Sequence, residues 1–365
     1  MLPIWQHEFA IGYAALGLLR TCFAGTMAGL QIPSTLLAER FGAPLVLAAG
    51  TALSGLGYLV AGASVGFWTL VVALLIGGLG SSTQHPLASA LVARAYAGPR
   101  SLKALGTYNF AGDIGKMSLP ALASLMLVVW PWQPTLTILG AFGFAAAAAI
   151  FWLAPRSPSA DADKPAKRAK VATAANGAGV PRRGFPLLLA IGMVDSATRM
   201  GFLIFLPFVL IAKGASLPTV GMALTLVFAG GAAGKLVCAF LGARFGVIAT
   251  VCLTEGLSTA GILALLPLPL EAALILLPVI GVMLNGTSSV LYGSVPELVV
   301  PAKRTRAFGI FYTGTIGSGA LAPALYGLVG DAVSVPFAVM TVAGSCLMTL
   351  PLALVLRPAL PETVR

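Results

Sequence analysis

Residues 36–42 read Leu-Leu-Ala-Glu-Arg-Phe-Gly, and residues 240–246 read Phe-Leu-Gly-Ala-Arg-Phe-Gly. The two segments lie about 204 residues apart, each between long apolar runs. With the spacing shortened by one, Lys103-Ala104-Leu105-Gly106 matches Arg306-Ala307-Phe308-Gly309, and Pro120-Ala121-Leu122 matches Pro323-Ala324-Leu325. Parallel repeats of this size are an architecture of membrane transporters. The repeat therefore predicts a duplicated chain with two similar halves.

The composition places both halves in a lipid bilayer. Of the 365 residues, 58% are hydrophobic and only 9% are charged, whereas about a quarter of the residues in a soluble domain are charged. Apolar runs long enough to cross about 30 Å of hydrocarbon recur along the whole chain. They lie at about residues 12–37, 44–62, 67–92, 103–128, 134–154, 185–212, 218–242, 247–266, 272–296, 307–329 and 335–355. The sequence thus predicts an all-α polytopic membrane protein with 11 transmembrane helices.

The basic residues indicate which way these helices face. Of the 22 Lys and Arg residues, 17 lie in alternate connections, and the opposite connections hold Lys213 alone. Loops rich in Lys and Arg stay in the cytoplasm, so we expect this set and the C-terminus on the cytoplasmic side of the plasma or inner membrane. The formal net charge of +11 is then a signal of topology, and nucleic acid is not expected as a partner.

The longest polar stretch divides the chain. Residues 155–184 are rich in Ala, Pro, Lys and Arg without periodicity, which predicts a disordered basic cytoplasmic linker or, alternatively, a segment that binds anionic lipid. Residues 1–154 are then an N-terminal helical bundle, residues 185–356 a C-terminal six-helix bundle and residues 357–365 a cytoplasmic tail. The four cysteines lie within apolar runs, so we expect no disulfide framework and no metal or cofactor.

The duplicated halves, the basic linker and the segment at residues 36–42 resemble the major facilitator superfamily. The signature of that family is Gly-x-Leu-Ala-Asp-Arg-x-Gly between its second and third helices. Here Thr35 replaces the glycine and Glu39 the aspartate, and the second copy has Ala243 at the acidic position. Within the family, Ser82-Thr83-Gln84-His85-Pro86 faintly resembles the fosmidomycin-resistance-type exporters. The resemblance covers the whole chain and implies two helical bundles and secondary transport.

The family has twelve helices, one more than the apolar runs of this sequence. In the repeat, Met1 corresponds to Phe205, near the end of the helix that opens the second half. About 20 residues, the length of one span, would be needed before Met1 to complete the corresponding first helix. We expect an apolar segment upstream, excluded by a start codon assigned too late. The alternative is a functional protein with eleven spans.

Seven formal charges lie within apolar runs, where each costs about 2.5–3.5 kcal/mol at the bilayer centre. They are Arg20, Asp113, Lys116, Asp195, Arg199, Lys235 and Glu255. Such groups must pair, take up a proton or face a water-filled cavity, so they are the primary candidates for a transport pathway. We expect Lys235 to extend its side chain to the cytoplasmic interface, and Glu255 to have a structural partner.

Two sets of polar residues share a helix face. Asn109, Asp113 and Lys116 are spaced i, i+4, i+7, and Asp195 and Arg199 are spaced i, i+4, all near mid-membrane. Asp113 is expected either to accept a proton or a cationic substrate, or only to neutralise Lys116. Asp195 is expected to carry a proton, and Arg199 to hold an anion because its guanidinium stays charged. The alternative is a pair that fixes helix packing.

Four more residues are candidates for the substrate and proton pathway. His85 suits a proton relay or, equally, a hydrogen bond across a helix interface. Asn285 and Tyr292 belong to an uncharged polar stripe that suits either substrate binding or close helix contact. Arg20 is expected to meet the first helix of the family, which this sequence lacks.

By the resemblance, Glu39, Arg40 and Arg244 belong to a cytoplasmic gate, in which arginines and a carboxylate near a helix N-terminus hold the inner side closed. The chain is then predicted to move a small molecule by alternating access, coupled to protons, as a monomer in the bilayer. The sequence lacks the ATP-binding motif G-x-x-x-x-G-K-[ST] and the metalloprotease motif H-E-x-x-H, so we expect neither ATP drive nor an enzyme. Export of a small amphiphile or drug is favoured. Uptake or exchange of an organic anion, and a sensor without flux, are the alternatives.

Overall fold

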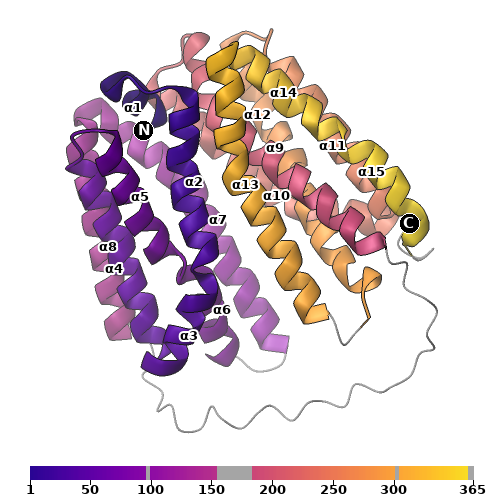
Figure 1. The fold of residues 1–365 in the computed structure, drawn as a ribbon, viewed down its shortest axis with the longest axis horizontal. Helices are drawn as coiled ribbons and strands as arrows, with labels where there is room; N and C mark the ends of the chain where they lie inside the picture. The colour runs from indigo at the N-terminus through magenta and orange to yellow at the C-terminus, as the bar shows by residue number, and fades with distance from the viewer. Residues whose placement is uncertain (96–98, 154–182, 301–303, 361–365) are drawn as a thin grey trace.

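The computed structural model describes residues 1–95, 99–153, 183–300 and 304–360, and within these ranges all regular structure is helical. Figure 1 labels the helices α1 (Leu2–Phe9), α2 (Tyr13–Gly29), α3 (Gln31–Phe41), α4 (Ala43–Gly62), α5 (Phe67–Ser81), α6 (Gln84–Ala95), α7 (Pro99–Val129), α8 (Trp132–Leu153), α9 (Gly184–Ala212), α10 (Leu217–Phe245), α11 (Val247–Leu265), α12 (Leu270–Ser294), α13 (Arg304–Ala332), α14 (Val335–Leu347) and α15 (Thr349–Leu356). Two short 3-10 helices, η1 (Val295–Leu298) and η3 (Arg357–Ala359), follow α12 and α15.

The number of membrane spans is roughly consistent with the eleven apolar runs. Nine spans in the described ranges are long and apolar enough to cross a membrane, with α5 and α6 forming one and α14 and α15 another. The pair α2 and α3, bent by 45°, provides a tenth. Helix α13 is 29 residues long, which is enough to cross a membrane, but it is not among these spans.

The repeated segment has the same backbone in both halves. Gly42 follows α3 with φ 88°, and Gly246 follows α10 with φ 84°. In each half the next helix, α4 or α11, starts at the following residue. A side chain is strained at this φ, so glycine is the residue that suits the turn. The sequence repeat therefore corresponds to a structural repeat.

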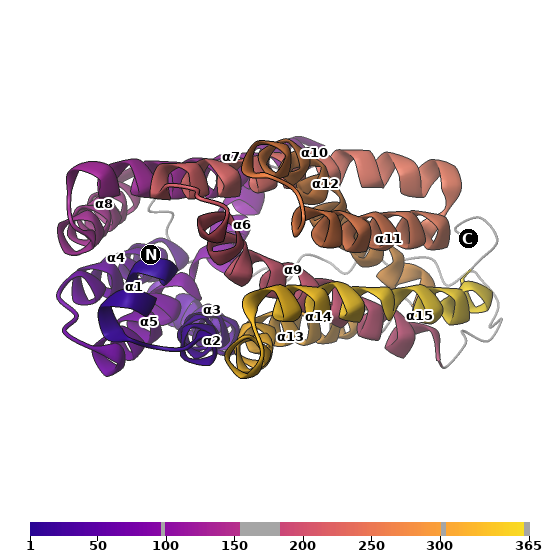
Figure 2. The same ribbon diagram turned by 90° about the horizontal axis from the view of Figure 1, so that it is seen from above.

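The two halves form two bundles that touch along two seams (Figures 1 and 2). Helices α1–α8 form one bundle and α9–α15 the other; α2 packs against α13 in one seam, and α7 against α10 in the second. Figure 2 shows the seams on opposite sides of the molecule, with α6 and α9 between them. Most of the linker predicted at residues 155–184 lies outside the described residues, and α9 already begins at Gly184.

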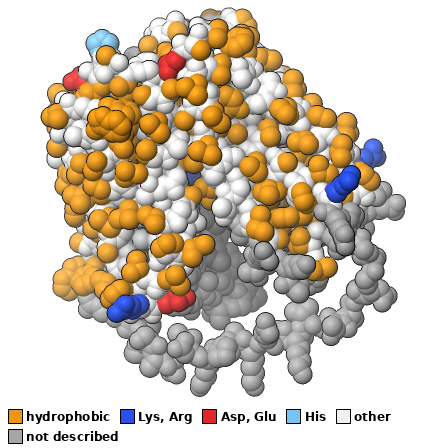
Figure 3. Space-filling view, viewed as in Figure 1, with side chains coloured by type: hydrophobic (Ala, Val, Ile, Leu, Met, Phe, Trp, Pro, Cys, Tyr) orange, Lys and Arg blue, Asp and Glu red, His pale blue; other side chains and the backbone are white. Residues whose placement is uncertain are grey.

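The outer surface is that of a membrane protein. In Figure 3, hydrophobic side chains cover the middle of both bundles, and the charged side chains visible on this face lie toward the helix ends. Large apolar side chains such as Phe142, Leu325 and Leu354 are more than half exposed. A soluble monomer rarely exposes apolar patches of this extent, and a hydrocarbon solvent accommodates them.

The seam between α2 and α13 is closed at one end of the molecule. We call the end that carries Arg40 and Arg244 the basic end, predicted to be cytoplasmic, and the opposite one the far end. Toward the far end, α2 and α13 cross so closely that a Cβ atom on Gly17 would lie 2.3 Å from the backbone oxygen of Pro323. The carboxylate of Asp331 accepts hydrogen bonds from two backbone amides at the start of α2, those of Tyr13 (2.6 Å) and Ala14 (2.8 Å). A carboxylate at a helix N-terminus also interacts favourably with the helix dipole.

The same seam opens toward the basic end. A pocket of about 220 Å³ separates α2 from α13 there, lined by residues from Thr21 to Gln31 and from Tyr312 to Leu321. Figure 1 shows the basic ends of α2 and α13 farther apart than their far ends. The molecule is therefore in a conformation closed at the far end and open toward the basic end.

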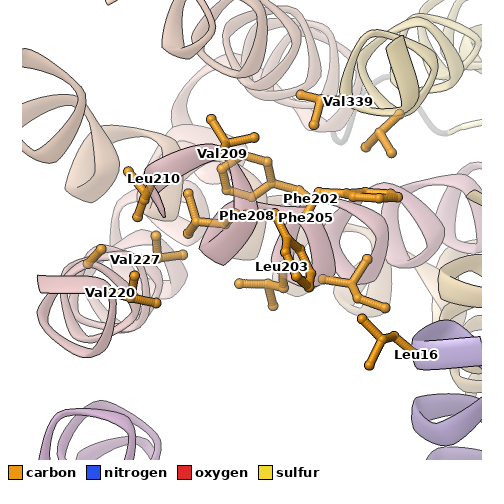
Figure 4. Close-up of a cluster of buried hydrophobic side chains, with 14 of the residues drawn as sticks. Leu16, Phe202, Leu203, Phe205, Phe208, Val209, Leu210, Val220, Val227 and Val339 are labelled. Atoms are coloured by element: carbon orange, nitrogen blue, oxygen red, sulfur yellow. The ribbon is translucent and has the colours of Figure 1, made fainter. Parts of the chain in front are cut away.

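Helix α9 lies at the centre of the packing. Every residue from Gly201 to Leu210 is buried. Figure 4 shows Phe202, Phe205 and Phe208 of this segment among apolar side chains of other helices. The neighbours include Leu16 of α2, in the other bundle. A displacement of α9 therefore changes side-chain packing in both bundles.

Removing the carboxylate of Asp331 should weaken the closed far end. We expect Asp331→Ala to destabilise the closed far end by about 1–2 kcal/mol. The carboxylate accepts hydrogen bonds from two amides and also interacts favourably with the helix dipole. Spin labels on Val65→Cys and Val333→Cys, exposed residues of the two bundles at the far end, report the separation. The distance between the two spin labels should increase in Asp331→Ala. Glu271→Ala removes an exposed acidic side chain at the same end and is the control; an unchanged distance distribution in Asp331→Ala would contradict the assignment.

A side chain at Gly17 should force α2 and α13 apart. Gly17→Leu is expected to lower the free energy of unfolding by about 1–3 kcal/mol, the usual cost of overpacking. The measurement is thermal unfolding in detergent, with Gly256→Leu as the matched control because its Cβ position has no atom within 4 Å. Equal melting temperatures for the two variants would show that the crossing is not tight.

Candidate functional site

Two carboxyl groups meet inside the C-terminal bundle. Asp195 on α9 is 3% exposed and Glu255 on α11 is 2% exposed, and their carboxyl groups lie close enough to share a hydrogen bond. The thiol of Cys346 on α14 donates a hydrogen bond to Glu255 Oε2 at 2.8 Å. An ionised carboxylate can only accept hydrogen bonds, so a bond between two carboxyl groups requires a proton on one of them. We call Asp195 and Glu255 the carboxyl pair.

The charge of the carboxyl pair is balanced by one cation. Arg199, one turn along α9, places a guanidinium nitrogen 4.0 Å from Asp195 Oδ2. Two carboxyl groups that share one proton carry a single negative charge, which Arg199 neutralises. The predicted i, i+4 pairing is thus observed, but Asp195 faces the interior of its bundle. The sequence predicted a structural partner for Glu255, and its partners are Asp195 and Cys346.

Hydroxyl groups surround the carboxyl pair. Thr287 of α12 donates to Thr254 Oγ1 at 2.8 Å, next to Glu255 in the sequence. Thr198 and Ser258 each lie three residues after a member of the pair, and their buried hydroxyl groups have no hydrogen-bond partner in the described part of the chain. The surroundings are therefore polar, and they can rearrange when the proton moves. Within the described ranges, no group of three or more His, Cys, Asp or Glu residues is arranged to hold a metal ion.

A second charged group lies in the seam between α7 and α10. Asp113 Oδ2 lies 2.7 Å from Lys235 Nζ of α10, and Asp113 Oδ1 lies 3.3 Å from Lys116 Nζ on its own helix. We call these three residues the seam cluster. The expectation that Lys235 reaches the cytoplasmic interface is wrong, because its ammonium group turns toward the carboxylate of the other bundle. The side chain of Asn109, the third member of the predicted face, lies outside the described residues.

His85 and Arg20 lie near the space between the bundles. His85 is exposed on α6 and lies within electrostatic range of Lys116 and Lys235. Arg20 of α2 directs a guanidinium N–H to the sulfur of Met200 on α9 at 3.4 Å, a contact between the bundles. Sulfur is a weak acceptor, and no carboxylate within the described ranges pairs with this guanidinium.

Asn285 and Tyr292, which belong to the polar stripe on α12, have different surroundings. Asn285 donates to the backbone oxygen of Gly281 at 3.2 Å and lies directly against Gly231 of α10, which supports the helix-packing alternative. Tyr292 stacks edge-on against Tyr312 of α13, with ring centroids 4.8 Å apart. Tyr292 thus lies at the basic end of the C-terminal bundle, close to a residue that lines the pocket between α2 and α13.

The predicted gate residues are exposed at the basic end. Arg40 lies over the ring of Phe41 at 5.4 Å, and Arg244 lies over Phe245 at 5.6 Å. Glu39 is also exposed, and no ion pair between the bundles involves these residues in the ranges that the structure covers. Arginines without an ion pair to the other bundle suit an open basic end, and their part in closing it stays a prediction.

Sequence spacing did not reveal the contacts between helices. The Asp195–Glu255 and Asp113–Lys235 contacts each join two helices, whereas the i, i+4 rule finds partners only on one helix. The available signal was Glu255 itself, which is a charge within an apolar run with no charged residue one turn away on its own helix. Such a residue needs a partner on another helix.

The fold and the family agree in the comparisons with known proteins. The sequence model of the Major Facilitator Superfamily matches residues 1–209 and 188–365. A bacterial homologue of the human lysosomal transporter Spinster, inward-facing and occupied, has a TM-score of 0.78 at 14% identity, covering 100% of this chain and 93% of that one. A mutant of the nucleoside transporter NupG has a TM-score of 0.77 at 15% identity, covering 96% and 92%. At these identities the likeness shows the fold alone.

No sequence among the curated proteins matches the chain, so the finer resemblance to fosmidomycin-resistance-type exporters finds no support there. The two family matches together extend from residue 1 to residue 365, and the two-bundle fold with its sequence repeat is that of the family. The chain belongs to the major facilitator superfamily of membrane transporters.

Proposed function

We propose that the protein is a proton-coupled secondary transporter that moves a small molecule by alternating access between its two bundles. The observation that supports proton coupling is the carboxyl pair, Asp195 and Glu255. The pair is buried in a membrane-spanning bundle, and two carboxyl groups this close can form a hydrogen bond only when one of them holds a proton. Intramembrane ionisable residues of this kind mark proton or substrate pathways.

Loss of the proton would change the charge balance around α9. Two ionised carboxylates in contact repel each other, and Arg199 neutralises only one of them. The repulsion favours a conformation in which Asp195 and Glu255 separate or meet water. Because α9 packs on both bundles, a shift of Asp195 biases the equilibrium between the closed and open far ends.

Two further properties of the transporter are its direction of transport and the kind of molecule that it carries. The sequence favours export of a small amphiphile or drug, and the alternative is uptake or exchange of an organic anion. The structure adds a specific observation in favour of the anion, because the seam cluster has two lysines and one carboxylate. We place the protein in the plasma or inner membrane as a monomer, with the basic end in the cytoplasm.

Neutral substitutions in the carboxyl pair should abolish coupling to a proton gradient. We expect Asp195→Asn and Glu255→Gln to lower gradient-driven accumulation at least ten-fold, because an amide cannot carry the proton. Exchange at equal pH should persist. The measurement uses proteoliposomes that contain the chain and a pH-sensitive dye, with ethidium or succinate as the probe and Glu271→Gln as the control for loss of an exposed acidic group.

Three outcomes of this experiment are decisive. Proton movement that depends on a probe and disappears in both variants supports the proposal. Full gradient-driven flux in Asp195→Asn removes that residue from coupling. Binding of a probe without any flux or proton movement would identify a sensor rather than a transporter.

A further inference from the structure

The seam cluster has more positive than negative charge. Lys116 and Lys235 share the single carboxylate of Asp113, with contacts of 3.3 Å and 2.7 Å. The carboxyl pair cannot supply the missing negative charge, because Asp195 is buried in the C-terminal bundle and is matched by Arg199. One lysine at this level of the membrane is therefore left without a counter-charge of its own among the described residues.

The cluster lies nearer the basic end than a hydrogen bond that joins α7 and α10. Nearer the far end, Thr225 Oγ1 of α10 donates to the backbone oxygen of Met117 on α7 at 2.5 Å. Lys235 lies ten residues from Thr225, about 15 Å along its helix, whereas Asp113 lies only four residues, about 6 Å, from Met117. The long side chain of Lys235 thus reaches back toward the far end to meet Asp113. The ion pair therefore joins the two bundles on the basic-end side of that hydrogen bond.

The cluster is directed toward the space between the seams. His85 on α6 is within electrostatic range of both lysines, and α6 packs on α7. Figure 2 places α6 between the two seams, inside the molecule. Arg20, which contacts α9 from α2, adds a further positive charge at the interface between the bundles.

The exposure of the three side chains indicates which charge a ligand can reach. The side chains of Lys116 and Lys235 are 55% and 46% exposed, whereas that of Asp113 is only 15% exposed. An anion can approach both ammonium groups directly. A cation could reach the carboxylate only after both lysines had moved away. The accessible charge is therefore positive.

From these observations we infer that Lys116 and Lys235 form the subsite that binds a carboxylate, phosphate or sulfonate group of the transported molecule. The inference rests on the proposed transport function and names its class of cargo. Asp113 occupies the two ammonium groups when no cargo is bound, and it competes with the anion for them. Each lysine contributes one charged hydrogen bond from a different bundle, so a bound anion holds the two bundles together at this level.

The competition between Asp113 and a bound anion can be tested by substitution. Asp113→Asn removes the internal competitor and should tighten anion binding at least five-fold. Lys116→Gln and Lys235→Gln should each weaken it at least ten-fold, and Lys235→Arg should restore part of the loss. Arg357→Gln removes a positive charge at the basic end, away from the seam, and should leave binding unchanged.

The experiment measures binding to the purified full chain by ligand-dependent thermal shift, confirmed by calorimetric titration. The probes are succinate, glycerol 3-phosphate and decanoate, with tetraphenylphosphonium as the cationic comparison. Tighter binding of one or more anions to Asp113→Asn, with weaker binding to both glutamine variants, supports the subsite. A gain of affinity cannot result from partial unfolding, so this arm stays informative even where a lysine variant is unstable.

Two results would overturn the inference. One is a panel in which no anion binds Asp113→Asn more tightly than the unmodified chain, which would reduce the seam cluster to a structural ion pair. The other is preferential binding of tetraphenylphosphonium that Asp113→Asn abolishes. Binding is measured without a gradient, so a failure of proton coupling in Asp195→Asn leaves this test intact, and the two proposals can fail separately.

Discussion

The free-energy cost of an ionised group in hydrocarbon organises this protein. Each formal charge within a span would cost about 2.5–3.5 kcal/mol if it were left at the bilayer centre without a partner. Asp195 and Glu255 avoid the cost when they share a proton inside one bundle, beside Arg199. Lys116 and Lys235 avoid most of it by sharing Asp113 between the bundles. The same cost makes these groups responsive, because a change in proton or ligand occupancy alters the balance of charge within the bilayer.

The two charged groups lie where they can influence a movement of the bundles. The far end is held by a close helix crossing at Gly17 and by the carboxylate of Asp331 on two amides of α2. The basic end is open, and Arg40 and Arg244 form no ion pair with the other bundle within the described ranges. Helix α9 connects these regions, since it carries Asp195 and its buried segment packs on both bundles. A small shift at the carboxyl pair therefore acts on the element that both bundles share.

The spans could be predicted from sequence because apolar length is a local property. The run at residues 185–212 became α9 (Gly184–Ala212), and the repeated glycines became turns with φ 88° and 84°. The ion pair of Asp113 with Lys116 and that of Asp195 with Arg199 also followed from helical spacing. Contacts between helices did not, because they depend on how the bundles pack. The side chain of Lys235 was therefore expected at the cytoplasmic interface and not beside Asp113. Glu255 was expected to have a structural partner, but that partner could not be identified as Asp195.

Infrared difference spectroscopy of the purified chain at neutral pH is the most direct measurement of the central claim, that the carboxyl pair holds a proton inside its bundle. The account predicts the carbonyl stretch of a protonated carboxyl group. This band should shift in heavy water and disappear in both Asp195→Asn and Glu255→Gln, while Glu271→Gln leaves it unchanged. A spectrum in which Asp195 and Glu255 are both ionised would contradict the account, because two carboxylates without a proton cannot form the hydrogen bond on which it depends.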